Sequence, residues 1–212
     1  FFSCKYGLNG ILADDMGLGK TLQALAVVQK AKEEDGPMPV LVICPTTVVF
    51  NWESEIQKFA PTLTTLKLAG VERKQFFKEI PNYDVVITSY ALVRRDINKL
   101  KEYNFRYVIL DESQNIKNAM SQTAQAVKKL QASHKLALSG TPIENKLEEL
   151  WSVFDFLMPG FLFSMAEFNS RYVNPIMERQ DKTVEKRLKL QIYPFILRRM
   201  KRDVESTRSE ER

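Results

Sequence analysis

Short apolar segments alternate with longer segments of helical periodicity along most of this 212-residue chain. This alternation is typical of βα units, in which helices cover both faces of a mostly parallel sheet. Several of the apolar segments, including VLVIC, VVIT and YVIL, are continuous or nearly continuous hydrophobic runs, as buried parallel strands require. The pattern predicts an α/β fold of three layers around a mostly parallel central sheet.

The element boundaries follow from the same pattern. The predicted strands are residues 10–13, 40–44, 64–68, 84–88, 107–110 and 135–139. The predicted helices are residues 20–34, 48–59, 72–79, 121–131 and 147–156, and we expect Thr46 or Thr47 to cap the second of them. After residue 160 the sequence looks helical, with breaks at Pro175 and Pro194 and no convincing strand. We therefore expect one domain over residues 1–160, followed by a helical extension and basic linker over residues 161–212.

Composition excludes several classes of protein. Hydrophobic residues make up 44% and charged residues 27% of the chain, and no apolar run is long enough to span a membrane. Two cysteines cannot build a disulfide framework or a zinc cluster. The N-terminus shows no targeting signal, so a cytosolic or nuclear protein is expected. The net charge of +5 comes entirely from residues 171–212, a modest surplus that is compatible with a polyanionic partner.

The strongest local motif is ILADDMGLGKT, where an apolar strand leads through a glycine loop into a helix. Gly17 and Gly19 would let backbone N–H groups approach a phosphate at the positive end of the helix. Lys20 would neutralise phosphate charge and Thr21 would place its hydroxyl on Mg²⁺. The strict pattern G-x-x-x-x-G-K-[ST] is not met, because Asp14 occupies its first glycine. The alternative, a glycine turn before an ordinary helix, does not explain why GLGKT lies at the junction.

Two later strands also end in polar residues. RYVILDESQ delivers Asp111, a candidate Mg²⁺ ligand, and Glu112, which could orient and deprotonate an attacking water. Taken alone, an Asp-Glu pair is more often a solvated loop or the start of a helix. KLALSGTPIEN places Ser139 and Thr141 around a glycine, and in isolation this segment is only a turn.

The ordered motifs DDMGLGKT, ICPTTVVFNW, ITSY, DESQNIKN, LSGTPIENKLEELWSVFDFLMPG and PFILRRMKRDV closely resemble the Swi/Snf-type ATPases of helicase superfamily two. These are the motors of chromatin remodellers and their prokaryotic relatives, and the compact motif spacing looks more prokaryotic. The resemblance covers nearly the whole chain. It is most specific in SGTPIEN with ELW and FLMPG, and least specific in GKT and DE. It implies the first of two RecA-like lobes in an ATP- and Mg²⁺-dependent motor that moves along double-stranded DNA without separating its strands.

The resemblance also assigns site residues. The nucleotide loop corresponds to Asp15, Met16, Gly17, Leu18, Gly19, Lys20 and Thr21. Asp111 and Glu112 match the magnesium-binding and water-activating pair, and Gln114 matches a polar residue that senses the γ-phosphate. The segment that couples hydrolysis to movement corresponds to Ser139, Gly140 and Thr141. Two positions depart mildly from the family: Asp15 replaces a usual Glu, and Ser113 stands where Ala or Gly is more familiar.

In similar proteins, loops after the second and fourth strands contact the DNA phosphates. The corresponding candidates here are Thr46, Thr47, Asn51, Thr88 and Ser89, with Trp52 and Tyr90 nearby. Lys117 and Asn118, just past the Asp-Glu pair, are further candidates. Hydroxyl and amide groups suit a motor that grips phosphates without reading bases. Each has a structural alternative, since Thr47 could cap a helix, Trp52 could fill the core and Tyr90 could simply pack.

Three other features have mainly structural interpretations. The basic segment Arg198, Arg199, Lys201 and Arg202 either binds phosphate or forms a hinge, and we favour a hinge that also assists DNA binding. His134 has no recognisable catalytic partner and is expected to be structural. Cys44 is expected to be a buried small hydrophobe.

The resemblance further implies partners: double-stranded DNA, a second RecA-like lobe of the same full-length chain, and DNA-bound proteins. The second lobe would supply an arginine finger, typically worth about 10³–10⁵ in rate, and none of its motifs follow Arg212. The family's adenine-recognising segment would precede Asn9. We therefore expect a fragment that hydrolyses ATP barely, if at all, by itself. The full protein would be nucleoid-associated in a prokaryote, or nuclear in a eukaryote.

Three alternatives remain open at this point. One is a strand-separating helicase of the same superfamily. Another is a nucleotide-binding regulatory module without turnover, although intact Lys20, Asp111 and Glu112 argue against it. A small-molecule kinase would leave the SGTP segment unexplained.

Overall fold

The computed structural model describes residues 9–15, 17, 19–140 and 146–198. Its centre is a seven-stranded sheet in the order β3-β4-β2-β5-β6-β1-β7, and all pairings given for it are parallel. The strands are β1 (Gly10–Leu12), β2 (Val40–Cys44), β3 (Thr65–Lys67), β4 (Val85–Ser89), β5 (Asn104–Leu110), β6 (Gln131–Leu138) and β7 (Ile196–Leu197). The predicted α/β fold with a mostly parallel sheet is confirmed.

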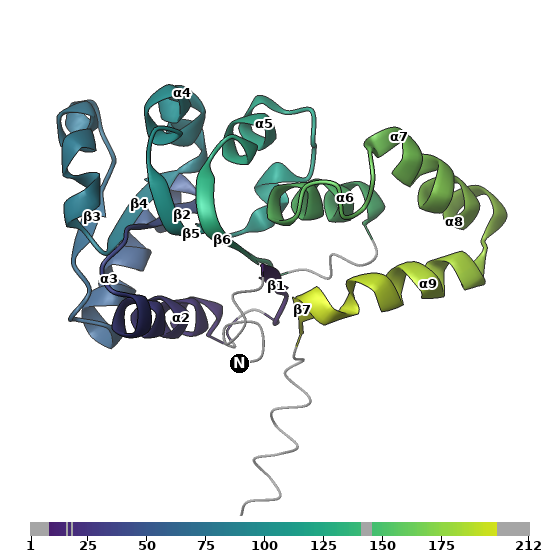
Figure 1. The fold of residues 1–212 in the computed structure, drawn as a ribbon, viewed down its shortest axis with the longest axis horizontal. Helices are drawn as coiled ribbons and strands as arrows, with labels where there is room; N and C mark the ends of the chain where they lie inside the picture. The colour runs from purple at the N-terminus through teal and green to yellow at the C-terminus, as the bar shows by residue number, and fades with distance from the viewer. Residues whose placement is uncertain (1–8, 16, 18, 141–145, 199–212) are drawn as a thin grey trace, which may run out of the picture.

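Helices cover both faces of this sheet. They are α2 (Lys20–Asp35), α3 (Val49–Phe59), α4 (Tyr90–Leu100), α5 (Gln122–Lys128), α6 (Leu147–Leu157), α7 (Met165–Phe168), α8 (Asn174–Arg179) and α9 (Lys182–Ile192). In Figure 1, α2 and α3 lie below the sheet, whereas α4, α5 and α6 lie above it. The three predicted layers are therefore present. No helix within the described ranges combines the length and the apolar character that crossing a membrane would need.

Alternation along the strands builds a separate core on each face. In β2, Leu41 and Ile43 belong to the core under α4, α5 and α6, while Val40, Val42 and Cys44 belong to the core under α2 and α3. All five side chains are at most 2% exposed. A fully buried aliphatic side chain contributes about 1.5–3 kcal/mol. The continuous apolar run is thus explained by burial on both faces.

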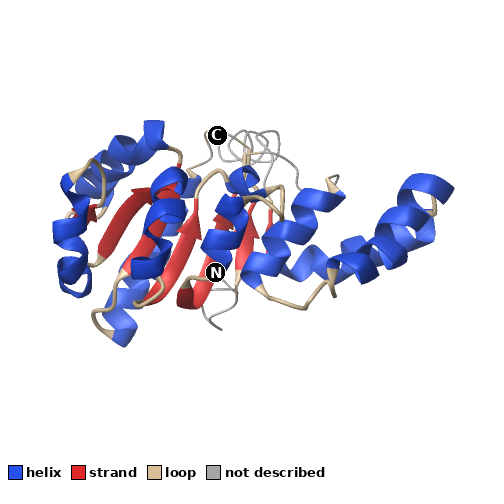
Figure 2. Cartoon of the chain, turned by 90° about the horizontal axis from the view of Figure 1, so that it is seen from above, coloured by secondary structure: helices blue, strands red, loops and turns tan. Residues whose placement is uncertain are grey.

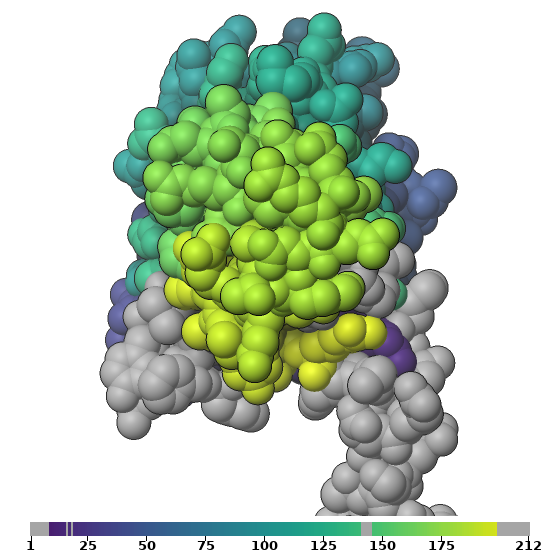
Figure 3. All heavy atoms as spheres, turned by 90° about the vertical axis from the view of Figure 1, so that its right-hand side faces the viewer, coloured from purple at the N-terminus to yellow at the C-terminus, as the bar shows by residue number. Residues whose placement is uncertain are grey.

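The chain after residue 160 forms an arm beside α6 and then returns to the sheet. The arm of α7, α8 and α9 projects to the right in Figures 1 and 2, and its residues form most of the face in Figure 3. Strand β7 then pairs with β1, and the N–H of Ala13 donates to the carbonyl of Leu197 at 2.8 Å. The prediction of no strand in this segment was therefore wrong. A division at residue 160 remains a proposal, and under it β7 contributes to the sheet of the preceding part.

Several predicted element details also differ. Neither Thr46 nor Thr47 caps α3: both lie in a 3₁₀ turn, Thr46–Val48, and the residue before α3 is Val48, without a side-chain cap. The helix predicted at 72–79 is 3₁₀ and extends over Glu72–Asn82. Pro175 lies in the first turn of α8 and does not break the helical segment, since the first turn needs no proline N–H. Pro194 does follow the end of α9.

Other boundaries were wrong and one helix was missed. The strand predicted at 107–110 begins earlier, at Asn104. The helix predicted at 121–131 ends at Lys128, because Gln131 already begins β6. His134 consequently lies inside a strand and not before one. Helix α4 had not been predicted, although its partly or fully buried Tyr90, Val93, Ile97 and Leu100 recur at helical spacing.

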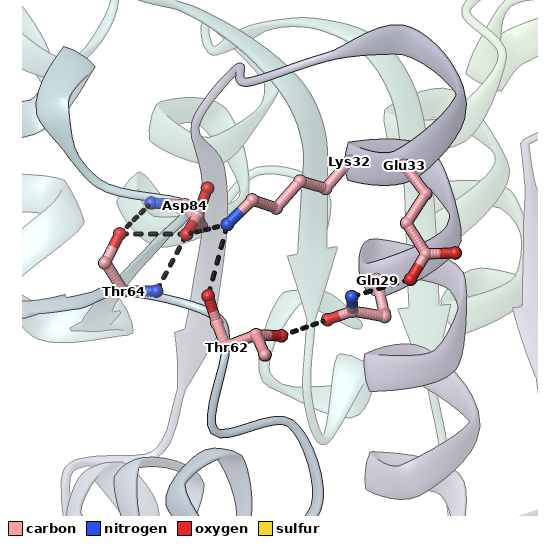
Figure 4. Close-up of polar contacts among 6 residues, drawn as sticks. All are labelled: Gln29, Lys32, Glu33, Thr62, Thr64 and Asp84. Carbon is pink, nitrogen blue, oxygen red and sulfur yellow. Dashed lines mark hydrogen bonds and ion pairs between the residues drawn. The ribbon is translucent and has the colours of Figure 1, made fainter.

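A polar network ties the C-terminal end of α2 to the starts of β3 and β4 (Figure 4). Lys32 Nζ donates to Asp84 Oδ2 at 2.8 Å and to the carbonyl of Thr62 at 3.2 Å. The N–H and hydroxyl of Thr64 donate to the same Asp84 oxygen, at 2.8 and 2.9 Å. Thr62 in turn donates to Gln29. The network fixes the C-terminal end of α2, the helix that follows the glycine loop.

Candidate functional site

The polar motifs meet at one edge of the sheet. Strands β1, β6 and β5 are neighbours and parallel, so their carboxyl ends lie together. The glycine loop follows β1 and Asp111 follows β5. Between them, Ser139 follows β6, and its N–H donates to the carbonyl of Leu12 at 2.9 Å. The carboxyl edge of a parallel sheet is where such folds bind ligands.

The glycine loop needs its two glycines for conformational reasons. Gly17 and Gly19 have φ angles of 86° and 75°, in the left-handed region that a Cβ disfavours. Gly19 is also the residue before the first turn of α2. Lys20 Nζ donates to the carbonyls of Asp14 at 2.8 Å and Asp15 at 3.3 Å, so the ammonium group is held over the loop itself. Met16 and Leu18 lie outside the described residues.

Asp14, which replaces the first glycine of the strict motif, has a structural task. Its side chain is fully buried, and Oδ2 accepts a hydrogen bond from Gln23 Nε2 at 3.0 Å. Gln23 lies in the first turns of α2, so this contact joins the end of β1 to the helix across the loop. Sequence reasoning noted Asp14 but missed its contact with Gln23. Thr21, the second residue of α2, is partly buried.

Asp111 is held from several directions. Its Oδ2 accepts from Trp52 Nε1 at 2.8 Å, and its Oδ1 accepts from the N–H of Glu112 at 2.9 Å. Burial raises the pKa of Asp111, and the charge of Glu112 adds to this rise. The Trp52 hydrogen bond and the positive charge of Lys20 lower this pKa but do not outweigh the rise. Lys20 and Asp111 are therefore close enough to interact electrostatically, as the shared edge requires.

Glu112 has an unusual backbone. Its φ is 49°, which for a non-glycine residue costs of order 1–3 kcal/mol and is concentrated at functional sites. Its Oε2 accepts from Gln114 Nε2 at 2.6 Å. The other amide atom, Gln114 Oε1, is buried without a hydrogen-bond partner among the described residues. The structure thus brings Gln114 to the carboxylate predicted to activate water and leaves its acceptor free for another group.

The predicted DNA-facing residues divide into two groups by exposure. Those with exposed side chains are Thr46, Thr47, Asn51, Lys117 and Asn118. Thr88 and Ser89 are only 1% and 2% exposed, because β4 lies inside the sheet, and the Thr88 hydroxyl donates to the carbonyl of Leu68. Neither hydroxyl is accessible to a phosphate in this structure.

The remaining predicted residues behave as follows. Ser139 is fully buried and Gly140 partly so, whereas Thr141 lies outside the described residues, as do Arg199, Lys201 and Arg202. Cys44 is buried as predicted, and burial, followed by the nearby charge of Asp111, raises its pKa to about 12. His134 packs its ring 5.0 Å from that of Tyr107, and its structural role stays a prediction.

This geometry suits one kind of ligand. Loop N–H groups, a helix N-terminus and an ammonium group favour phosphates. The Asp111 carboxylate and the Thr21 hydroxyl offer the oxygen ligands that Mg²⁺ prefers.

Comparison with known proteins identifies relatives over nearly the whole chain. The model of the SNF2-related domain matches residues 2–210. The TATA-binding protein-associated factor mot1 of Schizosaccharomyces pombe is 42% identical over 96% of this chain. The putative ATP-dependent helicase/translocase YwqA of Bacillus subtilis is 45% identical over the same share. The chain spans only 12% of the first relative and 23% of the second.

A solved structure supports the same relationship. The Sulfolobus solfataricus SWI2/SNF2 ATPase core in complex with dsDNA matches with a TM-score of 0.89 and 46% identity. The match covers 94% of this chain and 42% of that one.

Proposed function

This chain belongs to the SNF2-related domain family, and on that basis we propose that it is the nucleotide-binding lobe of an ATP-dependent motor that moves along double-stranded DNA. The reaction would be DNA-stimulated hydrolysis of ATP. One relative is named as a helicase/translocase, and the matched ATPase core was solved with dsDNA. Both names support the proposal for this chain.

One observation carries the proposal. Lys20, from the loop after β1, and Asp111, from the end of β5, lie close enough at one edge of the sheet for the lysine charge to act on the carboxylate. A triphosphate bound by the loop would therefore reach both groups. The alternative of a regulatory module without turnover does not explain why Glu112 is held in a strained backbone conformation next to Asp111.

The loop would bind the phosphates, and Glu112 would then act on the attacking water molecule. Lys20 would leave the carbonyls of Asp14 and Asp15 and neutralise the β- and γ-phosphates. Glu112, whose carboxylate is oriented by Gln114, would position a water molecule and accept its proton. The unpartnered Oε1 of Gln114 is available to sense a change at the γ-phosphate or at the segment after β6.

Mg²⁺ fits the oxygen donors present. Asp111 and Thr21 would hold it, because a buried carboxylate whose pKa is raised by burial gains from a nearby cation. When bound, the ion would neutralise charge on the transferring phosphoryl group.

A surface beside the same edge would face the DNA. Thr46, Thr47 and Asn51 lie after β2, and Lys117 and Asn118 lie shortly after Glu112. Their exposed hydroxyl, amide and ammonium groups suit phosphate contacts that do not depend on sequence. The proposed surface does not include the buried Thr88 and Ser89.

The test compares nucleic acids and one substitution in the full-length protein. ATP hydrolysis is measured with duplex DNA, single-stranded DNA and RNA in turn, and the proposal predicts the largest stimulation by duplex DNA. Replacing Glu112→Gln should lower the stimulated rate at least 10²-fold while nucleotide binding persists.

Glu102→Gln is the matched control, because Glu102 is exposed and pairs with Lys99 on the surface. Turnover unchanged by Glu112→Gln would favour a module without chemistry. Strand separation by the full-length protein would favour the helicase alternative. Slow turnover by residues 1–212 alone remains a prediction drawn from the family's arginine finger.

A further inference from the structure

Two buried aromatic residues hold Asp111, one by its side chain and one by its backbone. Trp52 Nε1 donates to Asp111 Oδ2 at 2.8 Å, and the Tyr90 hydroxyl donates to the Asp111 carbonyl oxygen at 2.6 Å. Trp52 is 1% and Tyr90 is 5% exposed. Because both donors are shielded from water, neither hydrogen bond is easily replaced by solvent.

These contacts restrict the orientation of the Asp111 carboxylate. Each carboxylate oxygen accepts one hydrogen bond, from Trp52 or from the N–H of Glu112, and each retains a further lone pair. Rotating the carboxylate would break both bonds. The lone pairs that remain therefore point in a fixed direction.

The two aromatic residues come from the starts of two helices at this edge. Trp52 lies in the first turn of α3, which follows β2 and the exposed Thr46 and Thr47. Tyr90 is the first residue of α4, directly after β4. Strands β4, β2 and β5 are neighbours in the sheet, so the segments after the first two reach the end of the third. Any shift of the first turn of α3 must move the indole that holds Asp111.

We propose that Trp52 and Tyr90 are positioning residues that fix Asp111 for its cation and connect the segments after β2 and β4 to that site. This inference rests on the proposed function in taking Asp111 as a ligand of Mg²⁺. Trp52 acts on the carboxylate and Tyr90 on the backbone that carries it. Groups that orient metal ligands typically change metal affinity 10–100-fold when they are lost.

The first test is Trp52→Phe in the full-length protein, which keeps an aromatic ring and removes the N–H. Binding of a fluorescent, non-hydrolysable ATP analogue is titrated with Mg²⁺. The variant should need about 10-fold more Mg²⁺ for half-maximal binding. Tyr90→Phe should need a few-fold more, since it removes one hydrogen bond to the backbone.

Trp151→Phe is the matched control, because the chain has two tryptophans and the Trp151 indole donates elsewhere, to the carbonyl of Phe163. It should leave the Mg²⁺ dependence unchanged. Equal dependence in Trp52→Phe and Trp151→Phe would overturn the inference while leaving the proposed function intact. Nucleotide binding that ignores Mg²⁺ in the unchanged protein would overturn both.

A second measurement leaves Trp52 in place and so avoids any folding defect at that position. In Trp151→Phe the tryptophan fluorescence of this chain comes from Trp52, which can be followed in a full-length protein with its other tryptophans replaced. Adding the ATP analogue with Mg²⁺ should change the emission, and adding it with a chelator should not. Identical spectra under the two conditions would contradict a contact between Trp52 and the cation ligand.

Discussion

Gly19 is the residue at which backbone conformation and phosphate binding are most directly linked. Its φ of 75° places it in the left-handed region immediately before α2, and an added Cβ would meet nothing closer than 3.8 Å. The cost of a side chain there is thus conformational and not steric. Gly36, at the other end of the same helix, has a φ of 81° and open space around it.

This pair gives a matched prediction. Gly19→Ala should lower the free energy of unfolding by about 1 kcal/mol, because alanine is strained in the left-handed helical conformation. Gly36→Ala should lower it by at least as much, because the ψ of −177° at Gly36 belongs to a conformation essentially restricted to glycine. Only Gly19→Ala should weaken ATP binding. Chemical denaturation and nucleotide titration of both variants check this, and equal nucleotide affinities would show that the loop conformation at Gly19 is not needed for the phosphates.

At this scale the sequence predicted candidate reactive groups but not the side chains that hold them in place. Lys20, Asp111 and Glu112 were identified from local motifs, and their shared edge follows from the parallel order of strands. The donor to Asp111 is Trp52, 59 residues earlier in the chain. No local pattern specifies such a partner, and the same burial made Trp52 indistinguishable from a core residue.

Among the elements, α2 depends on the Asp84 network at its C-terminal end (Figure 4). Burial by itself would raise the pKa of Asp84. The hydrogen bonds from Lys32 and Thr64, together with the positive charge of Lys32, outweigh burial and lower that pKa. A carboxyl with a lowered folded-state pKa stabilises the protein above its ordinary pKa of about 4. That stabilisation is lost as pH falls through the folded-state value.

Asp84→Ala should therefore lower the free energy of unfolding at pH 7 by about 2 kcal/mol, since it leaves the N–H of Thr64 without its acceptor. The difference in free energy of unfolding between the variant and the unchanged protein should become smaller below about pH 4. Asp35→Ala is the control, because its pair with Arg106 is more than half exposed on the aspartate side and should cost under about 1 kcal/mol. Urea unfolding at pH 7 and pH 3.5 measures both, and a constant difference would contradict the pH argument.

The elements that sequence reasoning missed have distinct physical causes. Helix α4 is rich in charge, and one residue on its buried face is Asp96, which pairs with the buried Arg73 at 2.6 Å. A charged residue at a buried position interrupts the apolar pattern by which the helix would have been recognised in the sequence. Strand β7 has two residues and, within the part of the chain that the structure describes, pairs with β1, nearly the whole chain away. Such a strand has no periodicity of its own and depends on the finished sheet.

At the scale of the whole molecule, the proposed nucleotide site lies at the carboxyl edge of the sheet, and the helical arm of α7, α8 and α9 projects beside α6 (Figures 1 and 3). The surplus positive charge lies in residues 171–212, within the arm and the segment that follows it. The family relationship agrees with the fold predicted from alternating strands and helices. The DNA surface remains a proposal.

The central claim is that the loop after β1 and the acids after β5 share one metal-bound nucleotide. A crystal structure with a non-hydrolysable ATP analogue and Mn²⁺ in place of Mg²⁺ tests it directly, because manganese is located by its anomalous scattering. We predict a single strong peak next to Asp111 and Thr21, with the γ-phosphate in contact with Lys20. A nucleotide in the loop with manganese bound far from Asp111, or a nucleotide bound elsewhere, would contradict the account.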